Sequence, residues 1–135
     1  IGQITHLNPD PEEPGAIIKL KESGIRLVAL TNGGQKTLEQ RMKNSGLAEF
    51  FYALYSIEAV QKVKPHPATY RYVLKQEKVD PNRAMLIAAH AWDVTGAQRA
   101  GLQSAFIERK GKFLYPIAKK PDLTGKTLQD IAEAL

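Results

Sequence analysis

The 135 residues carry a net charge of +5, and 43% of them are hydrophobic and 24% charged, a composition typical of a globular domain. No apolar run approaches the roughly 20 residues that span a bilayer, and no charged-then-apolar leader is visible, so we expect a cytoplasmic protein without membrane contact. The chain has no cysteine, which excludes disulfides, thiolate metal sites and cysteine nucleophiles within it.

The basic residues are spread along the chain, and their densest stretch, Arg109 to Lys120, is short. This distribution favours a solvated basic face over a nucleic-acid surface, and it also suits a small anionic substrate. We therefore expect no nucleic-acid partner.

The first twelve residues, Ile1 to Glu12, show no periodicity and are expected to connect the chain to whatever precedes it. Beyond them, apolar periodicity, prolines and glycines mark alternating helices and strands. In chain order we predict a helix over 14–23, a strand over 25–30, a helix over 37–45, a strand over 51–56, a helix that begins near Pro67, a strand over 84–89, a helix over 94–100, a strand over 103–107, a loop over 108–122 and a helix over 128–135.

The alternation of strands and helices predicts an α/β fold, with a parallel sheet covered by helices on both faces. The strand over 84–89 reads AMLIAA, a continuous apolar run that is typical of a strand buried on both faces. No repeat or second domain is apparent, so residues 1–135 are expected to form one unit.

Three polar segments follow strands or precede a helix, and we expect them to share one edge of the sheet. They are Thr31-Asn32-Gly33, Lys64-Pro65 and the segment from His90 to Asp93. The first offers a hydroxyl, an amide and backbone N–H groups that can hold an oxyanion or a carboxylate, although a plain turn explains it equally well.

The other candidates each have a structural alternative. Lys64 can keep a neighbouring carboxylate ionised, or it can be a surface lysine. Asp93 can orient water or cap a helix, and His90 can act as a base, donate to an anion or be a buried hydrogen-bonded residue. Tyr70 can belong to the core or direct its hydroxyl at a substrate.

The order of these segments carries a family resemblance. The stretches LVALTNGG, KVKPHPATY and MLIAAHAWDVTGAQRAGL resemble motifs two, three and four of the haloacid dehalogenase superfamily, most closely its type II L-2-haloacid dehalogenase branch. The similarity runs from about Pro11 to Leu135. The resemblance implies a hydrolase with a Rossmann-like fold in which an aspartate attacks the substrate carbon, forms an ester and is released by water.

Carried over by position, the resemblance implies catalytic roles for Thr31, Lys64 and Asp93. Thr31 resembles the hydroxyl that contacts nucleophile and substrate, Lys64 the lysine that keeps the nucleophile ionised, and Asp93 the aspartate that orients water. The implied substrate-binding residues are Asn32, which resembles an amide near the leaving halide, together with Gly33, Tyr70 and His90.

Two positions depart from the family pattern. The dehalogenase branch often has serine where this chain has Ala88 and asparagine where it has His90. The phosphatase members have a Gly-Asp pair and a magnesium ion in this region, but Ile87-Ala88 supplies no carboxylate. We therefore expect chemistry without a metal or cofactor.

The nucleophile pattern of the family, Asp-x-x-Gly-Thr in a first strand, is absent from the sequence. We expect a partial core that lacks the first strand and the cap, is inactive alone, and pairs with a second copy, exchanges a strand, binds its own N-terminal piece or re-pairs its sheet. Two alternatives stay open, a phosphatase with a degenerate metal site and a non-catalytic interaction module.

Overall fold

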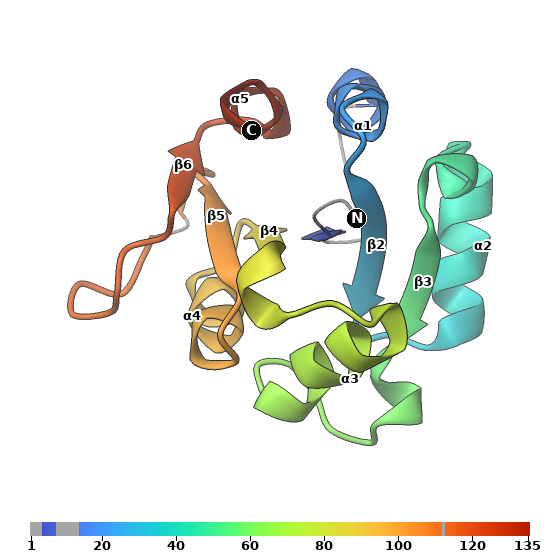
Figure 1. Cartoon of the computed structure of the whole chain (residues 1–135), viewed down its shortest axis with the longest axis horizontal. Helices are drawn as coiled ribbons and strands as arrows, with labels where there is room; N and C mark the ends of the chain where they lie inside the picture. The colour runs from blue at the N-terminus through green and yellow to red at the C-terminus, as the bar shows by residue number, and fades with distance from the viewer. Residues whose placement is uncertain (1–3, 8–13, 112) are drawn as a thin grey trace.

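The computed structural model describes residues 4–7, 14–111 and 113–135. In this part of the chain a six-stranded parallel sheet has the strand order β3-β2-β1-β4-β5-β6 (Figure 1). The strands are β1 (Ile4–Leu7), β2 (Arg26–Thr31), β3 (Ala53–Ser56), β4 (Ala84–Ala88), β5 (Gln103–Ile107) and β6 (Leu123–Gly125). The α-helices are α1 (Pro14–Glu22), α2 (Gln35–Ser45), α3 (Pro67–Glu77), α4 (Ala91–Arg99) and α5 (Leu128–Ala134).

The predicted α/β fold with a parallel sheet between two helical layers is confirmed. One buried cluster joins α1, α2 and α5 to the sheet, and a second joins α3 and α4 to the opposite face. Figure 1 shows α1 and α5 on one side and α3 and α4 on the other. Among the described residues, none of the helices combines the length and apolar character that a membrane crossing requires.

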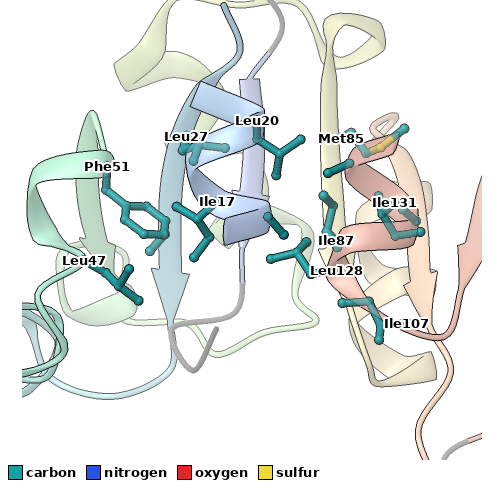
Figure 2. Close-up of a cluster of buried hydrophobic side chains, with 14 of the residues drawn as sticks. Ile17, Leu20, Leu27, Leu47, Phe51, Met85, Ile87, Ile107, Leu128 and Ile131 are labelled. Carbon is teal, nitrogen blue, oxygen red and sulfur yellow. The ribbon is translucent and has the colours of Figure 1, made fainter. Parts of the chain in front are cut away.

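The buried strands explain why the sequence folds in this way. Every residue of β4 is buried, as are the four inner residues of β2, so both faces of these strands need a helical cover. In the cluster of Figure 2, side chains of α1 and α5 meet side chains of β4 and β5. This cluster includes Ile17, Leu20, Ile87, Ile107, Leu128 and Ile131.

The first strand corrects one expectation. Residues 1–12 were expected to be a connecting segment, but Ile4–Leu7 forms β1 in the centre of the sheet, parallel to both β2 and β4. The remainder of that segment lies outside the described residues. β2 and β4 would otherwise each face a gap with unpaired backbone groups, and β1 pairs with both. A run of only four residues, two of them polar, gave no sequence signal for a central strand.

Two smaller differences concern the last third of the chain. β6 was not predicted, because its three residues carry little apolar pattern. Helix α4 begins at Ala91, three residues before the predicted start at Val94, and His90 occupies its N-cap position. Asp93 therefore lies inside the first turn of the helix, and the interpretation of Asp93 as the helix cap is wrong.

The central place of β1 gives a direct test. A Thr5→Pro variant removes one backbone N–H from a strand with neighbours on both sides, so we expect it to lower the free energy of unfolding by about 3 kcal/mol. A Thr5→Val variant keeps the donor and the β-branched shape, and should unfold near the wild-type urea concentration. Equal urea midpoints for the proline variant and the wild type would show that residues 4–7 do not pair within the sheet.

Candidate active site

The three segments singled out from the sequence meet at the carboxyl edge of the sheet. Thr31 is the last residue of β2, Asp93 lies in the first turn of the helix that follows β4, and Lys64 lies in the loop before α3. β2 and β4 are the two neighbours of β1, so the site spans the middle of the sheet. Ligand sites of open parallel sheets lie in this position.

Lys64 joins these segments through three hydrogen bonds. Its side chain is buried, with a relative exposure of 5%, and the Nζ atom donates to Asp93 Oδ2 at 2.9 Å and to the Leu30 carbonyl at 3.1 Å. Its backbone N–H donates to Asn32 Oδ1 at 2.8 Å. One residue thus fixes the end of β2, the loop after it and α4, and the surface-lysine interpretation is wrong.

Asp93 is held by both carboxylate oxygens. It is 1% exposed, and while Oδ2 accepts from Lys64, Oδ1 accepts from the hydroxyl of Tyr70 at 2.5 Å. A carboxylate inside a protein is stable only when it is paired and hydrogen-bonded. Removing an unpaired charge from water costs roughly several kcal/mol. Asp93 therefore depends on both neighbours.

Tyr70 belongs to the core and to the site at once. It is fully buried on α3, yet its hydroxyl faces Asp93. Burial raises the pKa of this hydroxyl far above its usual value, and the negative charge of Asp93 and the hydrogen bond to it raise the pKa further. Tyr70 is therefore a permanent hydrogen-bond donor to Asp93 at neutral pH.

Gly96 makes this close packing possible, although our sequence analysis gave it no role. A Cβ atom at this position would lie 2.5 Å from Pro65 Cβ and 2.8 Å from the Tyr70 hydroxyl oxygen. Only glycine lets α4 approach the loop of Lys64 and the tip of Tyr70 so closely. A glycine in the middle of a helical pattern was the available signal, because such a residue usually has a packing reason.

The loop after β2 is braced from within and from β3. The Gly33 N–H donates to Thr31 Oγ1 at 3.0 Å. This hydrogen bond stabilises the turn itself, as the plain-turn interpretation of Thr31-Asn32-Gly33 predicts. The Asn32 oxygen accepts from Lys64, which leaves its N–H₂ group as the part of that exposed side chain that can donate to a ligand.

Two further residues hold the same loop. The Ser56 hydroxyl donates to the Gly33 carbonyl at 2.6 Å, and Glu58 accepts from the backbone N–H of Gln35 at 2.6 Å, which places a carboxylate at the start of α2. Neither residue was predicted from the sequence. Ser56 is the last residue of β3 and Glu58 follows it closely, and only the sheet order brings the end of β3 beside the loop after β2.

His90 packs beside Trp92, whose ring lies close to the buried ammonium group of Lys64. Its ring is tilted by 34° against the ring of Trp92, with the centroids 5.4 Å apart, and the Trp92 centroid lies 5.8 Å from Lys64 Nζ. Both side chains are half-buried. His90 and Trp92 thus form the outer wall beside the Lys64–Asp93 pair.

The residues present do not match the ligand set of a hard divalent cation. In the part of the chain that the structure describes, no three His, Asp or Glu side chains gather so that they could hold a metal ion. Asp93 supplies one carboxylate at this edge, which Lys64 and Tyr70 already contact, whereas Mg²⁺ prefers several oxygen ligands. The donor chemistry at this edge suits an anion better than a cation.

Comparison with known proteins identifies the class to which this fold and site belong. The model of the family described as haloacid dehalogenase-like hydrolase matches residues 3–107. The chain therefore belongs to this family of hydrolases, and the resemblance found in the sequence is confirmed.

Dehalogenases are prominent among its relatives. Haloacetate dehalogenase H-2 of Moraxella sp. (strain B) is 30% identical over 98% of this chain and 59% of its own length, and the (S)-2-haloacid dehalogenase of Pseudomonas sp. (strain YL) is 28% identical over 94% and 55%. The crystal structure of the L-2-haloacid dehalogenase RSc1362 superposes with a TM-score of 0.86 and 26% identity, over 93% of this chain and 55% of that one.

Phosphate-cleaving relatives also occur. Pyrophosphatase PpaX of Bacillus thuringiensis (strain Al Hakam) is 31% identical over 87% of this chain and 55% of its own length. The chain thus spans between 55% and 59% of the length of these curated relatives.

The raised pKa of Tyr70 predicts how stability depends on alkaline pH. In the unfolded chain this hydroxyl titrates near its ordinary value of about 10. Since the folded-state pKa is higher, the contribution of Tyr70 to stability is complete below pH about 10 and is lost as the pH rises above that value. We expect a Tyr70→Phe variant to lose about 1–3 kcal/mol at neutral pH, because Asp93 Oδ1 loses its donor, and to show a shallower decline above pH about 10.

Urea unfolding at several alkaline pH values measures this slope. The pKa of Tyr55 is also raised by burial and by Glu77, so the slope should decrease in the Tyr70→Phe variant without vanishing. An exposed tyrosine, Tyr115, serves as the control, and Tyr115→Phe should keep the wild-type slope. Identical slopes for the wild type and Tyr70→Phe would contradict the assignment.

Proposed function

We propose that this chain supplies the supporting half of an active site that hydrolyses the carbon–halogen bond of a small 2-haloacid. The observation that carries the proposal is the buried Lys64 ammonium, held between Asp93 and the Leu30 carbonyl at the middle of the carboxyl edge. A fixed positive charge in this place can keep a carboxylate nucleophile ionised. The haloacid dehalogenases among the relatives support this choice of substrate.

The proposed reaction has two steps. A carboxylate oxygen of the nucleophile attacks C2 of the substrate, a C–O bond forms, and the halide leaves with the electrons of the carbon–halogen bond. Water then attacks the carbonyl carbon of the resulting ester, loses a proton, and releases the 2-hydroxy acid together with the regenerated carboxylate. In this scheme the Asn32 N–H₂ group donates to the departing halide and Thr31 contacts the substrate carboxylate.

Lys64 and Asp93 have linked tasks. Asp93 orients the Lys64 ammonium group, while Tyr70 holds Asp93 in position from the other side. Each carboxylate oxygen of Asp93 retains a second lone pair, so it can also accept a hydrogen bond from the hydrolytic water. His90 stands at the outer wall and can receive the proton that this water releases.

The nucleophile itself is proposed to come from outside these 135 residues. Of the five aspartates, Asp93 is engaged as described, Asp80 lies before β4 at the opposite edge, Asp122 Oδ2 accepts from the Ser104 N–H at 2.8 Å, and Asp130 Oδ2 accepts from the Lys126 N–H at 3.1 Å. Asp10 lies outside the described residues. We therefore expect no turnover by the isolated chain.

A magnesium-dependent phosphatase is the second candidate, and PpaX is the observation in its favour. The third candidate is a non-catalytic interaction module. If it is correct, no form of the protein will hydrolyse a haloacid or a phosphate ester.

Halide release tests the proposal. A protein that joins this chain to a nucleophile-bearing N-terminal part should release chloride from 2-chloropropionate, and Lys64→Met should lower kcat by about 100-fold or more because the nucleophile loses its fixed cation. Lys62→Met is the matched control, since Lys62 is exposed two residues away, and it should retain activity.

Three outcomes would overturn parts of this account. Magnesium-dependent hydrolysis of a phosphate ester without chloride release would favour the phosphatase. The absence of both reactions would favour the interaction module. Chloride release by the 135-residue chain alone would show that the nucleophile lies within it.

A further inference from the structure

The loop between β5 and β6 exposes apolar side chains to an unusual degree. Phe113 is 79% exposed, Tyr115 48% and Ile117 100%, and all three lie within five residues. Large apolar side chains that gather on a surface often mark a binding site. The mechanism proposed above makes no use of it.

The loop is fastened at its base. Gln98 Nε2 on α4 donates to the carbonyls of Lys119 and Lys120, both at 3.1 Å. The Glu108 N–H donates to the Gly125 carbonyl at 2.7 Å, which closes the other side of the base. Both ends of the loop are therefore tied, one to α4 and the other to β6.

An open groove lies between this loop and the start of α4. It has a volume of about 470 Å³, within the range of small-molecule sites, and its described lining is largely apolar and aromatic. The lining residues are His90, Ala91, Trp92, Gly111, Phe113, Leu114 and Tyr115.

The groove adjoins the candidate active site at Trp92, which lines the groove and lies beside Lys64. Its inner wall consists of His90 and Trp92, the two rings that stand beside the buried charges. The Trp92 ring centroid lies 5.8 Å from Lys64 Nζ. A ligand that places a carboxylate near the polar edge can therefore extend an apolar group past Trp92 into the groove.

We propose that this groove binds an aromatic or branched apolar substituent on the carboxylate substrate, so that Phe113 and Tyr115 determine specificity. The inference rests on the proposed function and narrows its substrate class from small 2-haloacids in general to those with an apolar substituent that reaches the groove. Aromatic walls on both sides give a planar ring favourable contacts, and its burial removes apolar surface from water.

A substrate group explains the groove better than a protein partner does. One wall of the groove is Trp92, whose ring lies 5.8 Å from the buried Lys64 Nζ. Exposed lysines flank it in the sequence at Lys110, Lys119 and Lys120, and their charge attracts small carboxylates. A second copy of the chain would meet the same positive charge on both sides, which opposes that arrangement.

Trp92 allows a direct measurement on the 135-residue chain. It is the only tryptophan in the sequence and lines the groove, so its fluorescence reports on occupancy. Phenylacetate and acetate are the probes, because they share a carboxylate and differ in the aromatic group. We expect phenylacetate to change the fluorescence with a Kd at least about tenfold lower than that of acetate. A single buried methylene can already give this discrimination, and the phenyl ring buries more apolar surface.

The loop variant shows whether the aromatic walls cause this preference. The double variant Phe113→Ala with Tyr115→Ala should raise the Kd for phenylacetate by about tenfold and leave the Kd for acetate unchanged. Tyr52→Ala is the matched control, because Tyr52 is 68% exposed and lines a different pocket, and it should bind both probes as the wild type does. Circular dichroism confirms that each variant is folded.

Two results would overturn the proposal. Equal Kd values for phenylacetate and acetate would exclude an apolar subsite. Loss of a dimer in the loop variant, with no effect of phenylacetate on the wild type, would identify the loop as an interface between copies. Chloride release from 2-chloropropionate is measured separately, so an enzyme that dehalogenates this acid without any preference for the aromatic probe refutes the groove alone.

Discussion

The buried ion pair between Lys64 and Asp93 is the interaction on which the arrangement of the site depends. Removing two charges from water costs roughly several kcal/mol for each charge. Only the attraction between them and additional hydrogen bonds offset that cost. Here the offset comes from the Leu30 carbonyl at the end of β2 and from the Tyr70 hydroxyl on α3. The pair can therefore exist only when β2, α3 and α4 are all in place, which links the integrity of the site to the fold.

The centre of the sheet sets the second constraint. β1 lies between β2 and β4, and the site lies at the carboxyl ends of these two neighbours. β1 therefore runs between the two strands whose ends carry the site, and the position of these ends depends on this central pairing.

The sequence predicted the elements whose signals are local and long, and it missed those that depend on neighbours. β4 was recognised from a continuous apolar run, and the convergence of Lys64 with Asp93 followed from the rule that parallel strands end at one edge. β1 carries no such signal, because the gap that it fills is created by two strands far away in the sequence. The task of Ser56 was invisible for the same reason, since it serves a contact across elements, and the sequence could mark Gly96 only as a glycine within a helix without naming its neighbours.

A double-mutant cycle between Lys64 and Asp93 tests the central claim most directly. The free energy of unfolding is measured for the wild type, Lys64→Met, Asp93→Asn and the double variant. If the two side chains form the buried pair, each single change leaves one group without its partner, and we predict a coupling energy of about 2 kcal/mol or more. Additive effects, with a coupling energy near zero, would show that the two residues do not interact, and the proposed site would then lose its foundation.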